Sequence, residues 1–172
     1  MKIYTTILLA LCLGCTKIRE CRLELNRFDY NSEELSIQGY YYTKADDGKI
    51  QPQFIFYRNG VIKQLGGTSY NEADLLEAEA SWLEIESINF SRNKRINWGI
   101  FHIFNDQIVL EIWSSSKGGA PPLYRRQGSI LNDSTFILTS YESCEGYSGE
   151  GEDTYYFKNL AVKPDSTNTV IE

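Results

Sequence analysis

Few residues in this chain have the types and spacing that catalysis requires. His102 is the only histidine, so any Ser-His or Cys-His nucleophile pair would have to use it. In one hairpin register it would lie opposite Glu111, whose carboxylate could orient the imidazole. However, no serine occupies a G-x-S-x-G turn, and none of the 23 acidic residues is marked as part of a glycosidase pair. The sequence therefore favours a protein that is not an enzyme and that needs no cofactor.

Aromatic residues point to binding instead. The chain has 12 Tyr, 8 Phe and 3 Trp, mostly in segments that resemble β-strands. Tyr and Trp combine an apolar body with a polar tip, which is typical of ligand pockets. We expect that eight side chains could converge on a small apolar or sugar-like ligand if they pointed into one site. They are Tyr40, Tyr42, Trp98, His102, Glu111, Trp113, Tyr124 and Arg126.

A hairpin over residues 97–114 would position several of these side chains. Two runs rich in β-branched and aromatic residues flank Asn105-Asp106-Gln107, and Asn and Asp tolerate the positive φ of a tight turn. Alternation then gives one wholly apolar face, made by Gly99, Phe101, Ile103, Ile108, Leu110 and Ile112. The other face is mixed, with Trp98, Ile100, His102, Phe104, Val109, Glu111 and Trp113. Either another segment covers this mixed face or a ligand binds it.

One helix interrupts the strand pattern, at residues 71–86. Asn71 is the expected N-cap, and Leu75, Leu76, Trp82 and Leu83 recur at helical spacing. We expect this stripe to pack on the sheet, with Trp98 and Trp113 as its favoured partners. The opposite side of the helix is acidic and should face solvent.

The remaining elements predict a mainly β domain over residues 35–161. Further strands are expected at residues 35–43, 51–57, 61–65, 123–131, 135–141 and 155–160, joined mostly by short turns. Sequential strands joined in this way pair antiparallel, and eight of them can close into an up-and-down barrel. A two-sheet sandwich is the alternative. The acidic glycine-rich segment 145–153 does not match a calcium loop and is expected to be solvated, and no metal site is predicted.

The chain begins with a secretion signal. Residues 1–14 place one lysine before an apolar run of about eleven residues, too short for a membrane span. The following L-C-L-G-C resembles the lipobox of bacterial lipoproteins, which implies acylation of Cys15. We therefore expect residues 15–34 to form an anchor and N-terminal segment, membrane contact through the lipid alone, and residues 162–172 to form a C-terminal tail.

Two cysteines would remain for the folded domain. Cys21 and Cys144 are predicted to form a disulfide in an oxidising compartment, with two separate thiols as the alternative. Two Cys and one His at unrelated spacings do not make a zinc site. The net charge of −6 repels phosphate backbones and argues against nucleic acid as a partner.

Several motifs, in order, are similar to those of small lipocalin-like lipoproteins of Bacteroidetes-type bacteria. They are Q-G-Y-Y-Y, F-Y-R-N-G, N-W-G-I-F-H-I, I-V-L-E-I-W, Q-G-S-I-L-N-D-S-T-F and Y-Y-F-K-N-L-A-V-K-P-D-S-T. The resemblance implies a lipocalin-like barrel on the outer membrane but no catalytic residue. It also implies O-glycosylation sequons at Ser134 and Ser166. The residues after Cys15, Thr16-Lys17-Ile18-Arg19, favour a position facing the periplasm over one on the cell surface.

Two functions stay open at this point. A lipid-anchored barrel that binds a small apolar or sugar-like ligand predicts an interior cavity of a few hundred Å3 or more. A non-catalytic interaction or accessory module, with an envelope protein as partner, predicts a filled barrel and an exposed aromatic patch.

Overall fold

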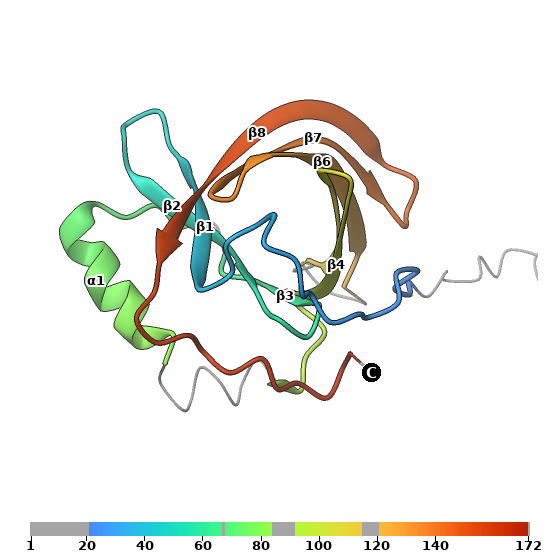
Figure 1. The fold of residues 1–172 in the computed structure, drawn as a ribbon, viewed down its shortest axis with the longest axis horizontal. Helices are drawn as coiled ribbons and strands as arrows, with labels where there is room; N and C mark the ends of the chain where they lie inside the picture. Colours follow the sequence, from blue (N-terminus) through green and yellow to red (C-terminus); the bar gives the residue numbers. More distant parts are fainter. Residues whose placement is uncertain (1–20, 67, 84–91, 115–120, 172) are drawn as a thin grey trace, which may run out of the picture.

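The protein forms a closed barrel of eight antiparallel strands (Figure 1). The computed structural model describes residues 21–66, 68–83, 92–114 and 121–171. The strands are β1 (Gly39–Lys44), β2 (Ile50–Phe56), β3 (Val61–Gln64), β4 (Trp98–Phe104), β5 (Gln107–Trp113), β6 (Leu123–Asn132), β7 (Thr135–Ser143) and β8 (Ser148–Asn159). Each strand pairs with the next in sequence, and β1 pairs with β8. The predicted up-and-down barrel is confirmed, and the sandwich alternative is wrong.

The β4–β5 hairpin has the predicted shared apolar face, and the structure determines its register. Gly99 pairs with Ile112, Phe101 with Leu110 and Ile103 with Ile108, so the six apolar residues share one face. Asn105 and Asp106 have φ values of 50° and 60°, as a two-residue turn of this hand requires. Local residue types therefore determine this hairpin.

The barrel interior is filled with aromatic and aliphatic side chains. One buried cluster takes residues from all eight strands, as only inward-pointing side chains can do. Rings meet across the barrel: Phe56 on β2 lies 5.8 Å from Phe136 on β7 and 4.9 Å from Phe101 on β4, between ring centroids. Tyr41 on β1 lies 5.0 Å from Phe136. Because these rings touch from wall to wall, the packed interior is the core of the protein.

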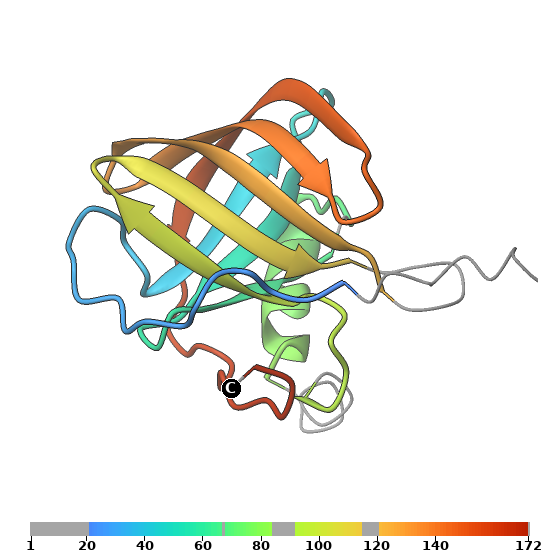
Figure 2. The same ribbon diagram turned by 90° about the vertical axis from the view of Figure 1, so that its right-hand side faces the viewer.

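Residues 21–30, which we call the strap, run along the outer face of β4 and β5 (Figure 2). The chain then turns across one end of the barrel, where Tyr30 and Leu35 enter the interior cluster. The Tyr30 hydroxyl accepts a hydrogen bond from Leu35 N (2.7 Å), and the Tyr41 hydroxyl donates to Ser36 O (2.9 Å). This end of the barrel is thus closed by the chain itself.

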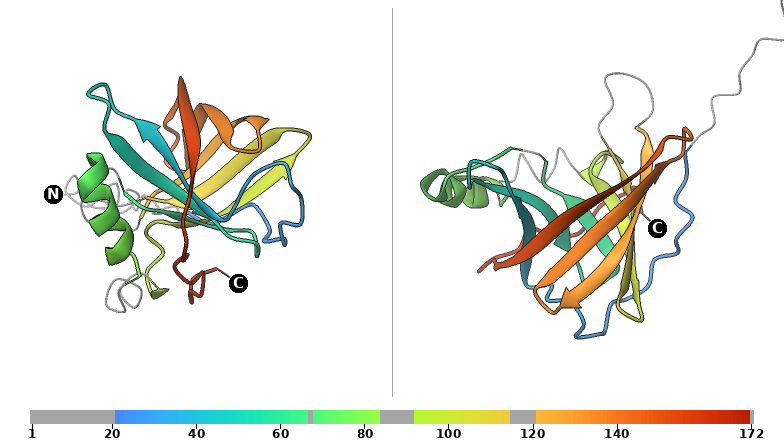
Figure 3. Two further views of the ribbon diagram at one scale, coloured as in Figure 1. Left: turned by 60° about the vertical axis from the view of Figure 1, so that its left-hand side comes forward. Right: turned by 90° about the horizontal axis from the view of Figure 1, so that it is seen from above.

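Helix α1 (Glu72–Ser81) follows β3 and packs on the outside of the barrel (Figures 1 and 3). Asn71 is its N-cap, accepting a hydrogen bond from Asp74 N at 2.9 Å. Leu75 is fully buried, but Leu76 is 66 % exposed and Leu83 is 37 % exposed, so the prediction that Leu76 and Leu83 belong to the packed stripe is wrong. Leu76 is rotated by about 100° from Leu75 and so falls outside the narrow contact face.

The C-terminal tail continues from β8 along the outside of the barrel (Figure 3). Its Lys163 ammonium donates to the carbonyls of Ile37 (2.7 Å) and Phe56 (2.6 Å) and lies 4.6 Å from the centroid of the Tyr57 ring. Further on, Ile171 is buried in a second apolar cluster on the outer face of the barrel. The tail and the strap therefore cover part of the same wall.

Strand β8 is longer than predicted. The sequence indicates a solvated loop over residues 145–153, but β8 begins at Ser148 and pairs with β7 from Glu142 onward. Gly149 and Gly151 lower the strand propensity of the part that belongs to β8, and pairing with β7 overrides it. The turn before Ser148 contains Gly146 with φ 91°, and the β7–β8 register shifts between the pairs Ser140–Glu150 and Leu138–Asp153.

Several predictions fall on residues outside the described ranges. They are the signal at residues 1–14, the acylated Cys15, and the end of the predicted helix beyond Leu83. In the described ranges, the structure has no helix that is both long and apolar enough to cross a membrane.

Candidate binding groove on the outer face of the barrel

The eight predicted ligand-binding residues do not form one site. Tyr124 pairs with Ile112 and Arg126 with Leu110, so both point to the inner side of the wall. The other six are Tyr40, Tyr42, Trp98, His102, Glu111 and Trp113, and they lie on the outer side. The expected convergence is wrong because the register of β6 against β5 puts Tyr124 and Arg126 on the opposite face from Glu111 and Trp113.

The inward-pointing Arg126 contributes to a polar group at one end of the barrel. It donates to Asp153 at 2.7 Å, and its guanidinium lies 5.8 Å from the Tyr155 ring centroid. Tyr124 contacts Tyr141, with 6.4 Å between ring centroids. Burial raises the pKa of Tyr155 to about 12, so its hydroxyl keeps its proton at neutral pH. These side chains lie at that end of the packed core.

Tyr40 and Tyr42 serve the packing of outer elements. The Tyr40 hydroxyl donates to Glu79 of α1 at 2.7 Å, and its ring meets Trp82 edge-on at 5.2 Å. Lys158 donates to the same Glu79 carboxylate. Burial raises the pKa of Tyr40, and the contact with Glu79 adds to the shift. Tyr42 packs against Tyr156 with 5.8 Å between ring centroids. The contacts of Tyr40 and Lys158 thus attach α1 to the barrel, whereas the Tyr42–Tyr156 contact joins β1 to β8.

Trp98 and Trp113 both belong to the outer apolar cluster, against which Trp82 packs. Trp98 lies 6.3 Å from Tyr57 between ring centroids, with the Lys63 ammonium 5.2 Å from its own ring centroid. The Arg95 guanidinium lies 5.5 Å from the Trp113 ring centroid. Trp82, the residue after α1, has its ring contact with Tyr40 and packs against the apolar cluster that contains Trp98 and Trp113.

Glu111 binds the strap. Its side chain is 2 % exposed, and one carboxylate oxygen accepts hydrogen bonds from the backbone N–H groups of Glu24 (2.7 Å) and Leu25 (2.9 Å). The other oxygen accepts from Arg125 at 3.1 Å. A buried carboxylate requires this degree of compensation. The mixed face of the hairpin is therefore covered by the chain's own N-terminal segment.

His102 also contacts the strap. Its Nε2 lies 2.6 Å from the carbonyl oxygen of Asn26, and its ring lies 5.4 Å from Phe28 between centroids. In the observed register His102 pairs with Val109, and Glu111 pairs with Ile100. The alternative register, in which Glu111 would lie opposite His102 and could orient it as a catalytic base, is therefore wrong.

The predicted disulfide between Cys21 and Cys144 is confirmed, with 5.7 Å between the Cα atoms. It attaches the start of the strap to the turn between β7 and β8. Beside it lies a groove of about 300 Å3 with mixed charge, lined in part by Glu24, Glu111 and Arg125. Arg22 and Glu142 line this groove as well.

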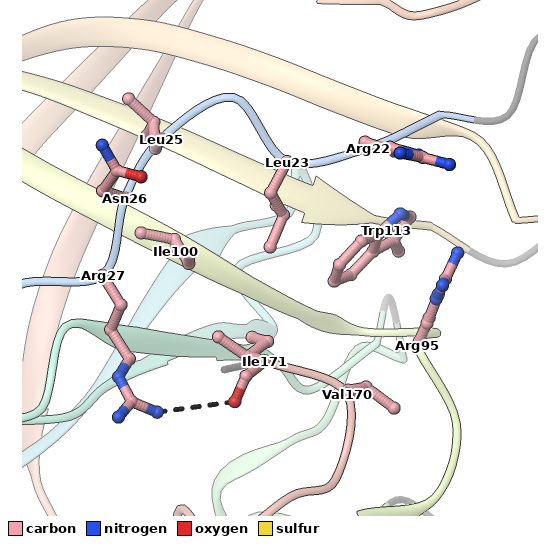
Figure 4. Close-up of a pocket in the computed structure, with 10 residues that line it drawn as sticks. All are labelled: Arg22, Leu23, Leu25, Asn26, Arg27, Arg95, Ile100, Trp113, Val170 and Ile171. Atoms are coloured by element: carbon pink, nitrogen blue, oxygen red, sulfur yellow. Dashed lines mark hydrogen bonds between the residues drawn. The ribbon is translucent and has the colours of Figure 1, made fainter.

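A second groove, of about 420 Å3, lies on the other side of the strap, between the strap, β4, β5 and the tail (Figure 4). We call it the outer groove. Trp113, Ile100 and Ile171 form its buried base, and Leu23, Leu25 and Val170 form half-buried walls. Its polar residues are Arg22, Asn26, Arg27 and Arg95. Of the strap residues, Leu23, Leu25, Asn26 and Arg27 line this groove, Glu24 lines the other, and Arg22 lines both.

The outer groove has a distinct charge. Among the described residues that line it, three are arginines and none is acidic, although acidic residues outnumber basic ones by 23 to 17 in the chain. Figure 4 shows Arg22 and Arg95 near the Trp113 end and Arg27 at the opposite end, where it donates to Ile171 O at 3.4 Å. Of the predicted ligand-binding residues, Trp113 alone lines this groove. The three arginines carry no local sequence signal, because distant segments bring them together.

The two serines of the predicted sequons lie in turns. Ser134, in the β6–β7 turn, donates from its hydroxyl to Asn132 at 2.9 Å. Ser166, in the tail, accepts a hydrogen bond from Asn59 at 3.2 Å. Both are partly exposed, and their glycosylation stays a prediction. Among the described residues, no group of three or more His, Cys, Asp or Glu side chains is arranged to hold a metal ion.

Comparisons with known proteins give no relative for this chain. No family model, curated protein or solved structure matches it.

Proposed function

We propose that this chain is a lipid-anchored, non-catalytic protein of the cell envelope that binds a small ligand on the outside of a filled barrel. The observation that carries this proposal is the packing of aromatic rings across the interior, together with an open groove on the outer face. A hollow lipocalin-like barrel would place the ligand inside. Here the interior volume is used for the core, so the accessible site is the outer groove.

Three features support a position in the envelope. The first fourteen residues read as a secretion signal, the lipobox-like sequence ends at Cys15, and a disulfide joins Cys21 to Cys144. Disulfides persist in oxidising compartments such as the periplasm. We propose that acyl chains on Cys15 anchor the protein in the outer membrane, with the barrel on the periplasmic side.

Fractionation of a Gram-negative host that expresses the chain with its own signal tests the anchor. The wild-type protein should sediment with the membranes, and Cys15→Ala should move it to the soluble or uncleaved fraction. Cys12→Ala is the matched control and should leave the protein membrane-bound. A wild-type protein found free in the periplasm would exclude the anchor. Protease added to intact cells then separates a periplasmic position, where the barrel is protected, from a surface position.

A protein partner is the second candidate function, and one surface favours it. Phe104 (74 % exposed) ends β4, Phe28 (63 %) contacts His102 of the same strand, and Leu131 (57 %) follows Ile130, whose N–H donates to Asp106 O in the β4–β5 turn. Exposed apolar groups of this kind are typical of interaction surfaces. A photo-crosslinking residue at position 104 should then give a discrete product in cells, while the same residue at the exposed position 162 should not.

A further inference from the structure

We infer that the edge of β8 that faces β1, over residues 148–154, binds an extended, basic segment of a partner protein as an added β-strand. We call this surface the β8 edge. It shares no residue with the described lining of the outer groove. A protein partner at this edge is therefore a second interaction, separate from the small ligand of the proposed function.

Strand β1 pairs with only the last part of β8. The pairs between the two strands end at Tyr42–Tyr156. The next residues of β1, Thr43 and Lys44, pair with β2. Beyond this point the β1–β2 hairpin and β8 diverge (Figure 3). In the described part of the chain, β7 is therefore the one strand that pairs with residues 148–154.

The β8 edge presents backbone groups to which a further strand could bind. The N–H of Phe157 donates to the carbonyl oxygen of Ser134, next to β7, at 2.8 Å. In an antiparallel strand, alternate residues turn their N–H and C=O groups toward the same neighbour, so those of Thr154 face away from β7. Residues 150–153 are all exposed. A strand edge of this kind is a template for strand addition.

Gly151 provides a second, independent observation. A Cβ added to Gly39, Gly99 or Gly128 would lie 1.8–2.1 Å from a carbonyl oxygen of the paired strand, so these glycines admit a close neighbouring backbone. A Cβ at Gly151 would meet no described atom within 4 Å, and its φ is not positive, as a bulge that requires glycine would need. Among the described glycines, only this one has neither explanation. A strand added along the β8 edge would supply the close backbone that the other three glycines have.

The charge of the β8 edge selects a basic partner. Glu150 and Glu152 are exposed, and the Asp153 side chain is 57 % exposed. Two nearby cations already have contacts, since Arg126 binds Asp153 and Lys44 lies over a tyrosine ring at 5.3 Å. Two copies of this chain paired edge to edge would place their carboxylates opposite one another, which is destabilising. An extended segment with Lys or Arg at alternate positions complements the edge instead.

Synthetic peptides test strand addition. We would titrate a fluorescein-labelled peptide of alternating Lys and Thr into the purified full chain, and follow fluorescence anisotropy and amide hydrogen exchange. Saturable binding and slower exchange at Thr154 are expected. A peptide of alternating Glu and Thr has the opposite charge and should not bind. The Lys–Thr peptide with every backbone nitrogen methylated keeps its charge but loses its N–H donors, and should bind at least roughly tenfold more weakly.

Variants of the chain test the location of the site. Gly151→Val should fold like the wild type in thermal unfolding and weaken binding roughly tenfold, because its side chain obstructs a close backbone. Thr154→Pro removes an N–H that faces the added strand and should also weaken binding. Glu150→Gln combined with Glu152→Gln should weaken binding roughly fivefold. The matched control is Glu72→Gln combined with Glu77→Gln, the same charge change at exposed positions of α1, and it should leave binding unchanged.

Four outcomes would overturn the inference. The first is no saturable binding of the Lys–Thr peptide, or equal binding of the acidic one. The second is equal binding of the methylated peptide, which would mean attraction by charge without strand addition. The third is unchanged binding to both Gly151→Val and Thr154→Pro, which would mean a different site. The fourth is a dimer of the chain that Thr154→Pro dissociates, which would identify a second copy as the occupant. None of these outcomes bears on the anchor or on the outer groove, so failure here is distinct from failure of the proposed function.

Discussion

At the scale of single residues, Glu111 determines how the N-terminal segment lies on the barrel. Its carboxylate accepts two backbone N–H groups of the strap and one guanidinium N–H within a site that is almost fully buried. Because Glu111 lies among buried apolar residues, its carboxylate would be costly to bury without hydrogen-bond donors. The strap supplies two of these donors, the N–H groups of Glu24 and Leu25, so the strap and the barrel wall stabilise each other.

Replacement of this carboxylate should be destabilising. Glu111→Ala leaves the amides of Glu24 and Leu25 without an acceptor and removes the ion-pair partner of Arg125. We expect the free energy of unfolding to fall by about 2–4 kcal/mol. Urea titration followed by tryptophan fluorescence measures this change. The matched control is Glu142→Ala, an exposed residue beside the other groove, which should change stability by about 0.5 kcal/mol or less. Equal effects of the two substitutions would contradict this role of Glu111.

Lys163 makes the stability of the protein depend on pH. Burial, with a smaller contribution from Arg58, lowers its pKa from 10.5 to about 8. Between these two values the folded chain binds fewer protons than the unfolded chain, so the free energy of unfolding rises as pH increases from about 8 to 10. Above about pH 10 the buried tyrosines reverse the trend, because burial raises the pKa of Tyr57 and Tyr155.

The test of this dependence is a series of denaturant titrations from pH 7 to 11. Wild-type stability should pass through a maximum near pH 10. Lys163→Met should flatten the rise between pH 8 and 10 and keep the decline above it. A rise of the same slope in Lys163→Met would assign the effect to another group.

At the scale of elements, helix α1 is attached to the barrel by a narrow face. Leu75 is fully buried, whereas its neighbour Leu76 is 66 % exposed. Leu75→Ala should lower the free energy of unfolding by about 2–4 kcal/mol, because it leaves a cavity under the helix. Leu76→Ala makes the same chemical change on the exposed side and should cost about 0.5 kcal/mol or less. Denaturant titration compares them directly, and similar losses would mean that the helix packs differently.

The elements also differ in how far the sequence predicts them. The apolar face of the β4–β5 hairpin was predictable because alternation and the Asn105-Asp106 turn are local signals, whereas the register itself was left open between two alternatives. The pairing of Cys21 with Cys144 followed from elimination among four cysteines. The sequence also indicated that the mixed hairpin face must be covered or occupied. It did not identify the strap as the cover, because alternating Arg22, Leu23, Glu24 and Leu25 have no mark that ties them to one strand.

The candidate site was less predictable than the fold. The outer groove combines residues of the strap, of β4 and β5, and of the tail, and Arg22, Arg95 and Ile171 are far apart in the chain. Charge and hydrophobicity patterns describe one element at a time. A site assembled from three distant segments therefore appears only when their packing is known.

At the scale of the whole molecule, the packed interior provides much of the stability. Phe136 is fully buried and stacks on Tyr155 with 4.7 Å between ring centroids. Phe136→Ala should lower the free energy of unfolding by about 3–5 kcal/mol, and a small apolar probe such as benzene should recover part of it by filling the cavity. Phe104→Ala, at a 74 % exposed position, is the control and should have little effect in thermal unfolding measurements. A wild-type protein that is itself stabilised by benzene would indicate a hollow barrel.

If acyl chains on Cys15 anchor the chain as proposed, the disulfide at the start of the strap determines where force enters the domain. Tension along the linker to the membrane would reach the domain at Cys21 and pass through the covalent bond to Cys144, bypassing the hydrogen bonds between Glu111 and the strap. Diffusion, crowding and drag from a bound partner would therefore not peel the strap away. Reduction of this bond would let the strap unzip from residue 21 toward Tyr30 and lengthen the tether by roughly 30 Å. The thiol–disulfide state of the envelope would then set how far the barrel stands from the membrane.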